Sequence, residues 1–164
     1  MPDFVGPTLL APDHVLEGFD CGDAALDSWL IHKARHNQRG GSSRTWVVTS
    51  DQRVAAFYSS STAVIVQSDA TKRAARNQPD PLPALLLGRL AVDTRFQGCG
   101  LGAALLKHFL LKSIEVAELT GVRALLVHAK DDGSASFYRR YGFEPSPVDD
   151  LTLMLLVQDV ARGM

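Results

Sequence analysis

A cluster of glycines in the second half of the chain has the composition and spacing of a phosphate-binding turn. Residues 97–102 read QGCGLG and lie between an apolar run and a helical pattern. The first amides of a helix lack intrahelical acceptors and lie at the positive end of its dipole, so they attract phosphate. A side chain at Gly100 or Gly102 would hold a phosphate away from these amides. We therefore predict a phosphate site; the alternative is an ordinary tight connection that needs glycine for its geometry.

Two other phosphate motifs overlap the same glycines. The spacing Gly98-x-Gly100-x-x-Ala103 fits the dinucleotide fingerprint G-x-G-x-x-G/A. A dinucleotide-binding unit normally opens with this turn, whereas here a helix and a hairpin are expected before it and too few residues follow for a second half. No Gly-Lys-Ser/Thr follows the glycines, which excludes a P-loop.

The elements around the turn alternate between strands and helices. Residues 85–92 are a nearly continuous apolar run, which predicts a strand covered on both faces. Helical spacing continues from Gly102 to about Leu119. Further on we expect a buried strand at 124–129, a helix at 134–141 and a last strand at 151–155. This order predicts an α/β fold with a mixed central sheet flanked by helices.

The first half of the chain predicts a short helix and a hairpin. Leu26, Trp29 and Leu30 have helical spacing after Asp23, a residue suited to cap the helix. Residues 45–49 and 54–58 are rich in β-branched and aromatic residues and are separated by a polar turn, as in a β-hairpin. The irregular segment 67–83 is expected to be a loop.

Length and composition exclude several classes of protein. The 164 residues, 46% of them hydrophobic, suit one domain spanning residues 1–164. With 17 basic and 18 acidic residues, no global field attracts nucleic acid or lipid. Cys21 and Cys99 form no metal or disulfide motif, and His32 and His36 have no third ligand in view, so no metal is expected. The absence of a leader or an apolar span predicts a soluble, cytoplasmic protein without membrane contact.

Two motifs resemble the GNAT acetyltransferases. Gln97-x-x-Gly100-x-Gly102 is similar to their Q/R-x-x-G-x-G/A signature, and residues 137–143, FYRRYGF, are similar to their xYxxxGF segment. The resemblance covers residues 85–143 and implies the GNAT acyl-CoA N-acyltransferase fold, with acetyl-CoA as the acetyl donor. It also implies that Tyr138 faces the sulfur of coenzyme A, where its hydroxyl can protonate the leaving thiolate.

The same resemblance implies which residues bind acetyl-CoA. The backbone amides of Leu90 and Val92 are expected to hold the thioester and pantetheine as an added strand would. Many family members have an asparagine that contacts the pantetheine arm where this chain has residues 131–134, DDGS, so the chain departs from the family pattern there. The expected set is Leu90, Ala91, Val92, Gln97, Gly98, Cys99, Gly100, Leu101, Gly102, Ala103, Ser134 and Phe137.

A narrower resemblance, to the TacT-type toxins of type II toxin–antitoxin systems, spans nearly the whole chain. It rests on LDSWL at 26–30, AFYS at 56–59, PDPLP at 79–83 and GRLAVD at 88–93. The resemblance implies acetylation of the free α-amine of aminoacyl-tRNA, which blocks translation. It also implies a homodimer and a ribbon-helix-helix antitoxin.

The residues themselves give one indication about the acceptor. Residues 85–92 contain no carboxylate that could serve as a general base. At pH 7 a lysine amine is about 0.04% neutral, whereas an α-amine of pKa about 7.7–8.0 is about 10–20% neutral. The absence therefore favours an α-amine, with Asp93, Asp131 or water still able to act as the base.

Basic residues gather before the hairpin and in the segment before the central strand. Such local patches can bind phosphates without a global field, although they also fit an ordinary solvated surface. Two alternatives stay open: an acetyltransferase of another amine, such as a polyamine, an antibiotic or a protein N-terminus, and a non-catalytic module that binds acetyl-CoA. The residues predicted to bind RNA are Lys33, Arg35, Arg39, Arg44, Arg76 and Arg89.

Overall fold

The structure is a computed structural model that describes residues 2–163, and these form two compact units. Strands β3 (Arg53–Ile65) and β4 (Leu82–Val92) and helix α4 (Leu101–Leu119) contribute residues to both units. The expectation of a single domain stays a prediction. The first unit comprises the residues up to Ser61 and Gly88–Phe109, and the second comprises Thr62–Leu87 and the residues from Leu110 onward.

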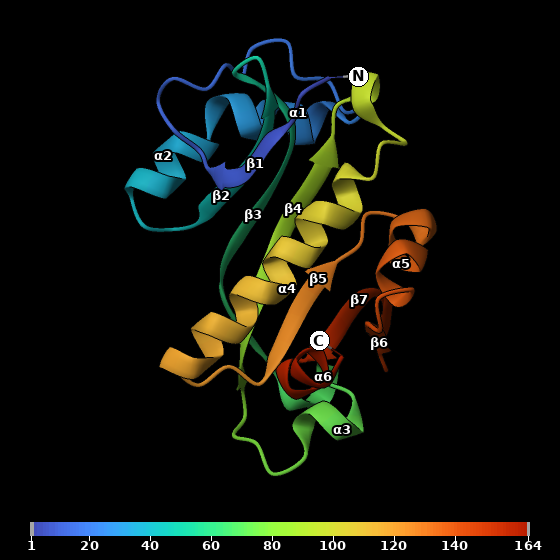
Figure 1. The fold of residues 1–164 in the computed structure, drawn as a ribbon. Coiled ribbons are helices and arrows are strands. Elements are labelled where there is room, and N and C mark those ends of the chain that lie inside the picture. The colour runs from blue at the N-terminus through green and yellow to red at the C-terminus, as the bar shows by residue number, and fades with distance from the viewer. Residues whose placement is uncertain (1, 164) are drawn as a thin grey trace. The chain divides into compact units, whose positions relative to one another are not determined.

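The sheet of the first unit contains the predicted hairpin (Figure 1). β2 (Arg44–Ser50) pairs with β3 in antiparallel register, and β1 (Val5–Leu9) pairs with the other edge of β2. Between β2 and β3, Asp51 and Gln52 have φ angles of 50° and 66°. A type I′ turn needs positive φ at both central residues, and it matches the twist of the strands that it joins. The hairpin prediction is therefore confirmed.

Helix α1 (Ala24–His32) begins where the sequence predicts because Asp23 caps it. Asp23 Oδ1 accepts hydrogen bonds from the amides of the next turn, at 3.0 and 3.4 Å. Trp29 is buried and its ring stacks on that of Phe57 in β3, with centroids 6.1 Å apart. The apolar face of α1 therefore packs on the hairpin. A second helix, α2 (Ala34–Arg39), follows directly and buries only Ala34.

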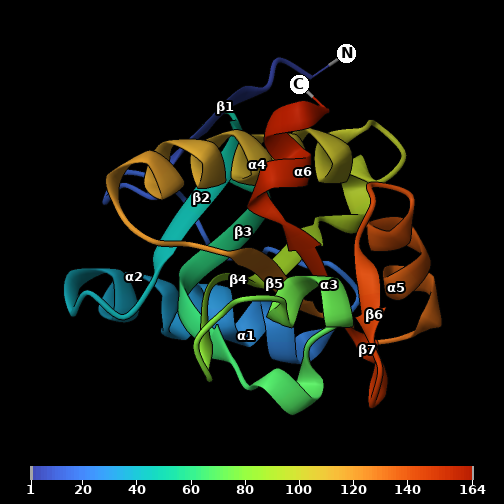
Figure 2. The ribbon, with the colours of Figure 1, turned by 90° about the horizontal axis from the view of Figure 1, so that it is seen from below.

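The sheet of the second unit has the order β4-β5-β7-β6 (Figure 2). β5 (Ala124–His128) is parallel to β4, in a register that runs from Ala84 opposite Ala124 to Leu87 opposite Val127. β7 (Asp149–Leu156) is antiparallel to β5, and the short β6 (Glu144–Ser146) is antiparallel to β7. Parallel and antiparallel pairs occur together, so the prediction of a mixed sheet is confirmed.

The helices of the second unit include two that the sequence did not predict. α5 (Asp132–Arg139) matches the helix expected near 134–141. The segment expected to be a loop instead contains the 3₁₀ turn η1 (Gln67–Asp69) and helix α3 (Lys72–Ala75), which Thr71 caps through its hydroxyl. The loop prediction was wrong there because capping and packing, not apolar periodicity, order the segment. α6 (Val157–Arg162) follows β7.

Candidate functional site

The glycine turn connects β4 to α4 through the 3₁₀ turn η2 (Thr94–Phe96) and two left-handed residues. Gly98 and Gly100 both have a φ of 83°, and a Cβ built at either would meet nothing within 4 Å. Residues with a Cβ adopt this conformation at a cost of roughly 1–2 kcal/mol. Glycine is therefore required by the backbone and not by crowding, and open space lies in front of both residues.

The amides of this turn are free to bind a ligand. The Ala104 amide donates to the Gly100 carbonyl at 3.1 Å and is the first amide of α4 with a backbone acceptor. Within residues 2–163, the amides of residues 98–103 have no hydrogen-bond acceptor. They lie at the N-terminus of a helix of 19 residues, where the dipole favours negative charge. The turn can hold a phosphate or pyrophosphate.

Side chains on both sides of the turn fix its conformation. Gln97 Nε2 donates to the carbonyls of Val92, at 3.0 Å, and Cys21, at 3.3 Å. The Gln97 side chain thus closes the turn, and contact of this residue with a ligand stays a prediction. Asp93 accepts two hydrogen bonds of 3.0 Å from the Arg95 guanidinium and one of 3.2 Å from the Asp20 amide.

Neither aspartate proposed as a general base is free to act as one. Burial raises the pKa of Asp93, but hydrogen bonds from Arg95 and from backbone amides outweigh burial and leave the pKa below its ordinary value. Asp131 caps α5, and its hydrogen bond from the Ser134 amide lowers its pKa. A carboxylate with a lowered pKa accepts a proton less readily, so another group must act as base if one is needed.

The end of β4 presents two amides away from β3. The amide of Asp93 donates to the Ala55 carbonyl of β3 at 2.8 Å. Because successive N–H groups of a strand point to opposite edges, the amides of Val92 and Leu90 point away from β3. The pairing of β4 with β5 ends at Leu87. The predicted thioester contacts at Leu90 and Val92 therefore use amides at an edge that β3 does not occupy.

Tyr138 is held on α5 by other aromatic rings. Its side chain is buried, with the rings of Phe137 and Phe143 at centroid distances of 5.2 and 5.7 Å. Burial raises the pKa of Tyr138. Its hydroxyl therefore stays protonated at neutral pH. The hydroxyl can donate a proton to a ligand.

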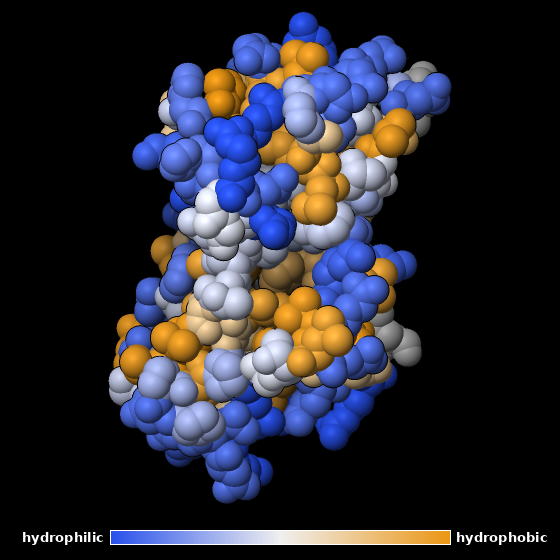
Figure 3. All heavy atoms as spheres, turned by 90° about the vertical axis from the view of Figure 1, so that its left-hand side faces the viewer, coloured by the Kyte–Doolittle hydropathy of each residue, from blue (hydrophilic) through white to orange (hydrophobic). Residues whose placement is uncertain are grey.

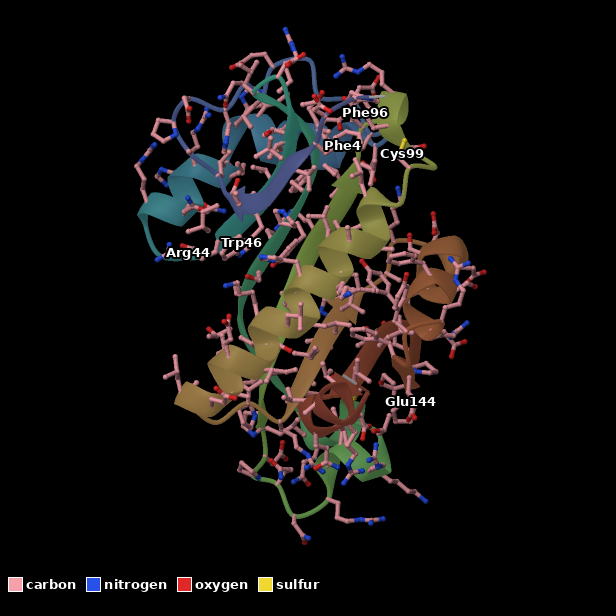
Figure 4. The ribbon with its side chains drawn as sticks, viewed as in Figure 1. Phe4, Arg44, Trp46, Phe96, Cys99 and Glu144 are labelled. Carbon is pink, nitrogen blue, oxygen red and sulfur yellow. The ribbon has the colours of Figure 1, made fainter. Side chains whose placement is uncertain are left out.

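The basic residues predicted to bind RNA are used in different ways. Lys33 and Arg39 are exposed, at the two ends of α2. The face of the molecule in Figure 3 carries both hydrophilic and hydrophobic areas. Arg35 Nη2 donates to three carbonyls of the preceding loop, so this guanidinium supports the fold. Arg44, labelled in Figure 4, donates to the Gln38 carbonyl at 2.9 Å.

Arg89 forms a contact that the sequence did not predict. Its guanidinium lies over the ring of Trp29, 4.1 Å from the centroid, and burial lowers its pKa. No carboxylate among residues 2–163 pairs with it. The two residues are far apart in the sequence, so no local pattern could have indicated this cation–π pair.

The remaining candidate, Arg76, is the C-cap residue of α3 in the second unit.

In residues 2–163, no helix is long and apolar enough to cross a membrane. The same part of the chain contains no group of three His, Cys, Asp or Glu residues that could hold a metal ion.

Together, the fold and the glycine turn define a class of enzyme. Residues 41–145 match the acetyltransferase (GNAT) domain family, and this span contains both the turn and Tyr138. The chain belongs to the GNAT acetyltransferase family.

Its relatives include bacterial toxins. The chain is 40% identical over 164 residues to the tRNA-acetylating toxin of Mycobacterium tuberculosis, a match that covers 100% of this chain and 98% of that protein. It is 25% identical over 162 residues to the probable toxin TacT of Sinorhizobium fredii, with coverage of 92% and 90%. The predicted resemblance to the GNAT family and its toxins is confirmed.

Solved structures of related toxins have the same fold. A tyrosine-to-phenylalanine mutant of the toxin AtaT, bound to the C-terminus of the antitoxin AtaR and to acetyl-CoA, is 25% identical with a TM-score of 0.82; the match covers 99% of this chain and 98% of that one. AtaT complexed with acetyl-methionyl-tRNAfMet is 24% identical with a TM-score of 0.89, covering 98% of both chains, and supports the fold alone.

Proposed function

We propose that this protein is a toxin-type N-acetyltransferase that transfers the acetyl group of acetyl-CoA to the free α-amine of aminoacyl-tRNA and thereby blocks translation. The observation that carries the proposal is the 40% identity, over the whole chain, to a tRNA-acetylating toxin. The free amides of the glycine turn and the protonated hydroxyl of Tyr138 are consistent with it.

Acetyl-CoA supplies the activated acetyl group, and the chain supplies its binding site. The amides of residues 98–103 would bind the pyrophosphate, because they are free and lie at a helix N-terminus. Leu90 and Val92 would donate hydrogen bonds to the thioester and pantetheine. Ala91, Gln97, Ser134 and Phe137 complete the proposed binding residues. Related structures of AtaT contain bound acetyl-CoA.

In the proposed reaction the acceptor nitrogen attacks the carbonyl carbon of the thioester. A carbon–nitrogen bond forms, the carbon–sulfur bond breaks, and Tyr138 donates its proton to the sulfur that leaves. Because its pKa is raised, Tyr138 is protonated at neutral pH, so its proton is present when negative charge develops on the sulfur.

Several basic residues are proposed to bind the phosphates of tRNA. Lys33 and Arg39 are exposed and available, and Arg89 has no acidic partner among the described residues. Arg44 and Arg76 are further candidates. Arg35 remains in the proposed set as a further positive charge of α2, although its Nη2 donates to protein carbonyls.

A comparison of acceptors tests this function. Labelled acetyl-CoA is incubated with the protein and with aminoacyl-tRNA, uncharged tRNA or a panel of polyamines. We expect label in the aminoacyl-tRNA alone, released with the amino acid when mild base cleaves the ester. Label found only in polyamines would support the alternative of a small-molecule acetyltransferase and overturn the proposal.

We also propose that the protein acts in the cytoplasm as a homodimer that a ribbon-helix-helix antitoxin neutralises. Aminoacyl-tRNA is used in the cytoplasm, and related AtaT structures contain the C-terminus of the antitoxin AtaR. The edge strand β1 exposes Val5 by 61% and Leu9 by 41%, which suits pairing with a second copy. Sedimentation of the purified protein, alone and with the antitoxin, tests both partners.

A further inference from the structure

A cavity of about 300 Å³ opens in the second unit beside the end of β5. One wall is apolar and includes the exposed side chains of Val64, Val66 and Val148. The other wall is polar. The volume of the cavity is at the lower end of the range for small-molecule sites and is large enough for an amino acid. The polar wall includes Asp69, His128, Asp149 and Thr152.

Three of the polar residues form a chain of hydrogen bonds. The Thr152 hydroxyl donates to Asp149 Oδ2 at 2.9 Å and lies 3.2 Å from His128 Nδ1. His128 and Thr152 are direct partners in the β5–β7 register, which explains the second contact. Asp149 also accepts a hydrogen bond from the Leu151 amide, and this bond and that from Thr152 lower its pKa.

The number of protons shared by Asp149, Thr152 and His128 in these hydrogen bonds determines the tautomer of His128. Asp149 is ionised, so it can only accept, and the single hydroxyl proton of Thr152 is donated to it. The Thr152 oxygen then accepts a hydrogen bond from His128, whose proton must be on Nδ1. The neutral imidazole is left with a lone pair on Nε2. His128 is exposed at the cavity, so this lone pair is available to a ligand.

The position of His128 in the sheet also suits a role in the reaction. It is the last residue of β5 and directly follows Val127, the last residue of β5 that pairs with β4. Ligands of α/β proteins bind where the carboxyl ends of parallel strands separate. The two carboxylates considered as bases, Asp93 and Asp131, are instead engaged as hydrogen-bond acceptors.

We propose that Nε2 of His128 accepts the proton that the α-ammonium group of the acceptor must lose, and that the adjacent cavity holds the aminoacyl group. This inference rests on the proposed function and adds a base and an acceptor subsite to it. Besides His128, the titratable groups of the described chain that line the cavity are Asp69, from η1, and Asp149, from β7. Both are carboxylates, which favour an ammonium group over a neutral ligand.

The proton transfers balance over the whole reaction. His128 takes one proton from the ammonium group and later releases it to solvent. The neutral amine attacks the thioester, and the sulfur leaves with the proton of Tyr138. The phenolate then recovers a proton from the nitrogen of the new amide. The products are the N-acetylated aminoacyl-tRNA, coenzyme A and one released proton.

The substitution His128→Asn tests the base. The asparagine amide can donate to Thr152 in place of Nδ1, but it has no group at the position of Nε2. Such a variant uses only acceptor that is already neutral, which is about 10–20% of an α-amine of pKa about 7.7–8.0 at pH 7. We therefore expect kcat/KM to fall about five- to tenfold at pH 7 and to approach that of the wild type at pH 9. An acceptor in which an amide replaces the labile ester allows this pH range.

Matched variants separate this role from a structural one. Thr152→Val breaks the hydrogen-bond chain and should cause a smaller loss with the same pH dependence. His14→Asn, a histidine outside the cavity, should have no effect. A loss in His128→Asn that does not change with pH, or no loss, would overturn the inference while leaving the proposed function intact. A wild-type protein that acetylates no aminoacyl-tRNA would overturn the proposed function and this inference together.

Discussion

Tyr138 can act as the proton donor to a leaving thiolate because its side chain is buried and its hydroxyl stays protonated at neutral pH. Tyr138→Phe keeps the ring and its packing. We expect turnover to fall by at least about a hundredfold while acetyl-CoA affinity is unchanged, because general acid catalysis contributes roughly 10²–10⁴. Steady-state kinetics and calorimetry measure the two quantities. Tyr141→Phe, a more exposed tyrosine on the same segment, is the control. Equal turnover in both variants would exclude Tyr138 as the acid.

Gly100 allows a comparison between backbone strain and ligand binding. Gly41 has nearly the same φ, 80° against 83°, and equally open surroundings, but it lies between α2 and β2. Changing either residue to Ala should lower the free energy of unfolding by about 1 kcal/mol. Only Gly100→Ala should weaken acetyl-CoA binding, by about tenfold or more, since it disturbs amides that bind a charged group. Calorimetric titration and urea unfolding test this, and equal affinities in the two variants would contradict it.

At the scale of elements, the polar contacts of Asp93 hold the turn between β4 and α4. Because its pKa is lowered in the folded protein, the stability that it contributes is present above its ordinary pKa of 3.8 and is lost as the pH falls through the folded value. Asp93→Asn should cost about 2 kcal/mol at pH 7 and less at pH 3. Urea unfolding at both values measures this, with the exposed Asp13→Asn as control. The same loss at both pH values would show that charge is not the cause.

Helices and strands with a long apolar pattern could be predicted from the sequence, whereas elements that lack such a pattern could not. Helix α4 and strands β4 and β5 have long apolar patterns and agree with expectation to within a few residues. β1, with the sequence VGPTL, is exposed along most of its length and exists because it pairs with β2. β6 has three residues, and α2 buries one. α6 was missed as well. Tertiary pairing, which no local window contains, determines these elements.

The candidate site likewise contains local features that the sequence predicts and long-range contacts that it does not. The glycine turn is local, so its residue types and spacing were sufficient to predict a phosphate site. The pairs of Arg89 with Trp29 and of His128 with Thr152 join residues distant in the sequence. Such contacts depend on which strands are neighbours, and the sequence does not state this.

At the scale of the whole molecule, the net charge of −1 leaves tRNA binding to local patches. Lys33→Ala combined with Arg39→Ala should weaken tRNA binding and reduce the slope of log K against log salt by about 1.5, since each phosphate contact contributes roughly 0.7–0.9. Filter binding at several salt concentrations measures the slope. Lys112→Ala with Arg162→Ala removes the same charge from residues that already have acidic neighbours. An equal change in both double variants would show that total charge, and not α2, determines binding.

The position of Cys99 gives the protein an intrinsic chemical reporter. Its thiol is exposed between two glycines of the glycine turn (Figure 4), whereas burial raises the pKa of the second thiol, Cys21, to about 11. Reaction with an alkylating reagent requires the thiolate, so at neutral pH Cys99 is modified first. We expect a nucleotide bound across the turn to shield this thiol. The rate of alkylation thus follows occupancy of the donor site directly, without any acceptor and in variants that no longer turn over.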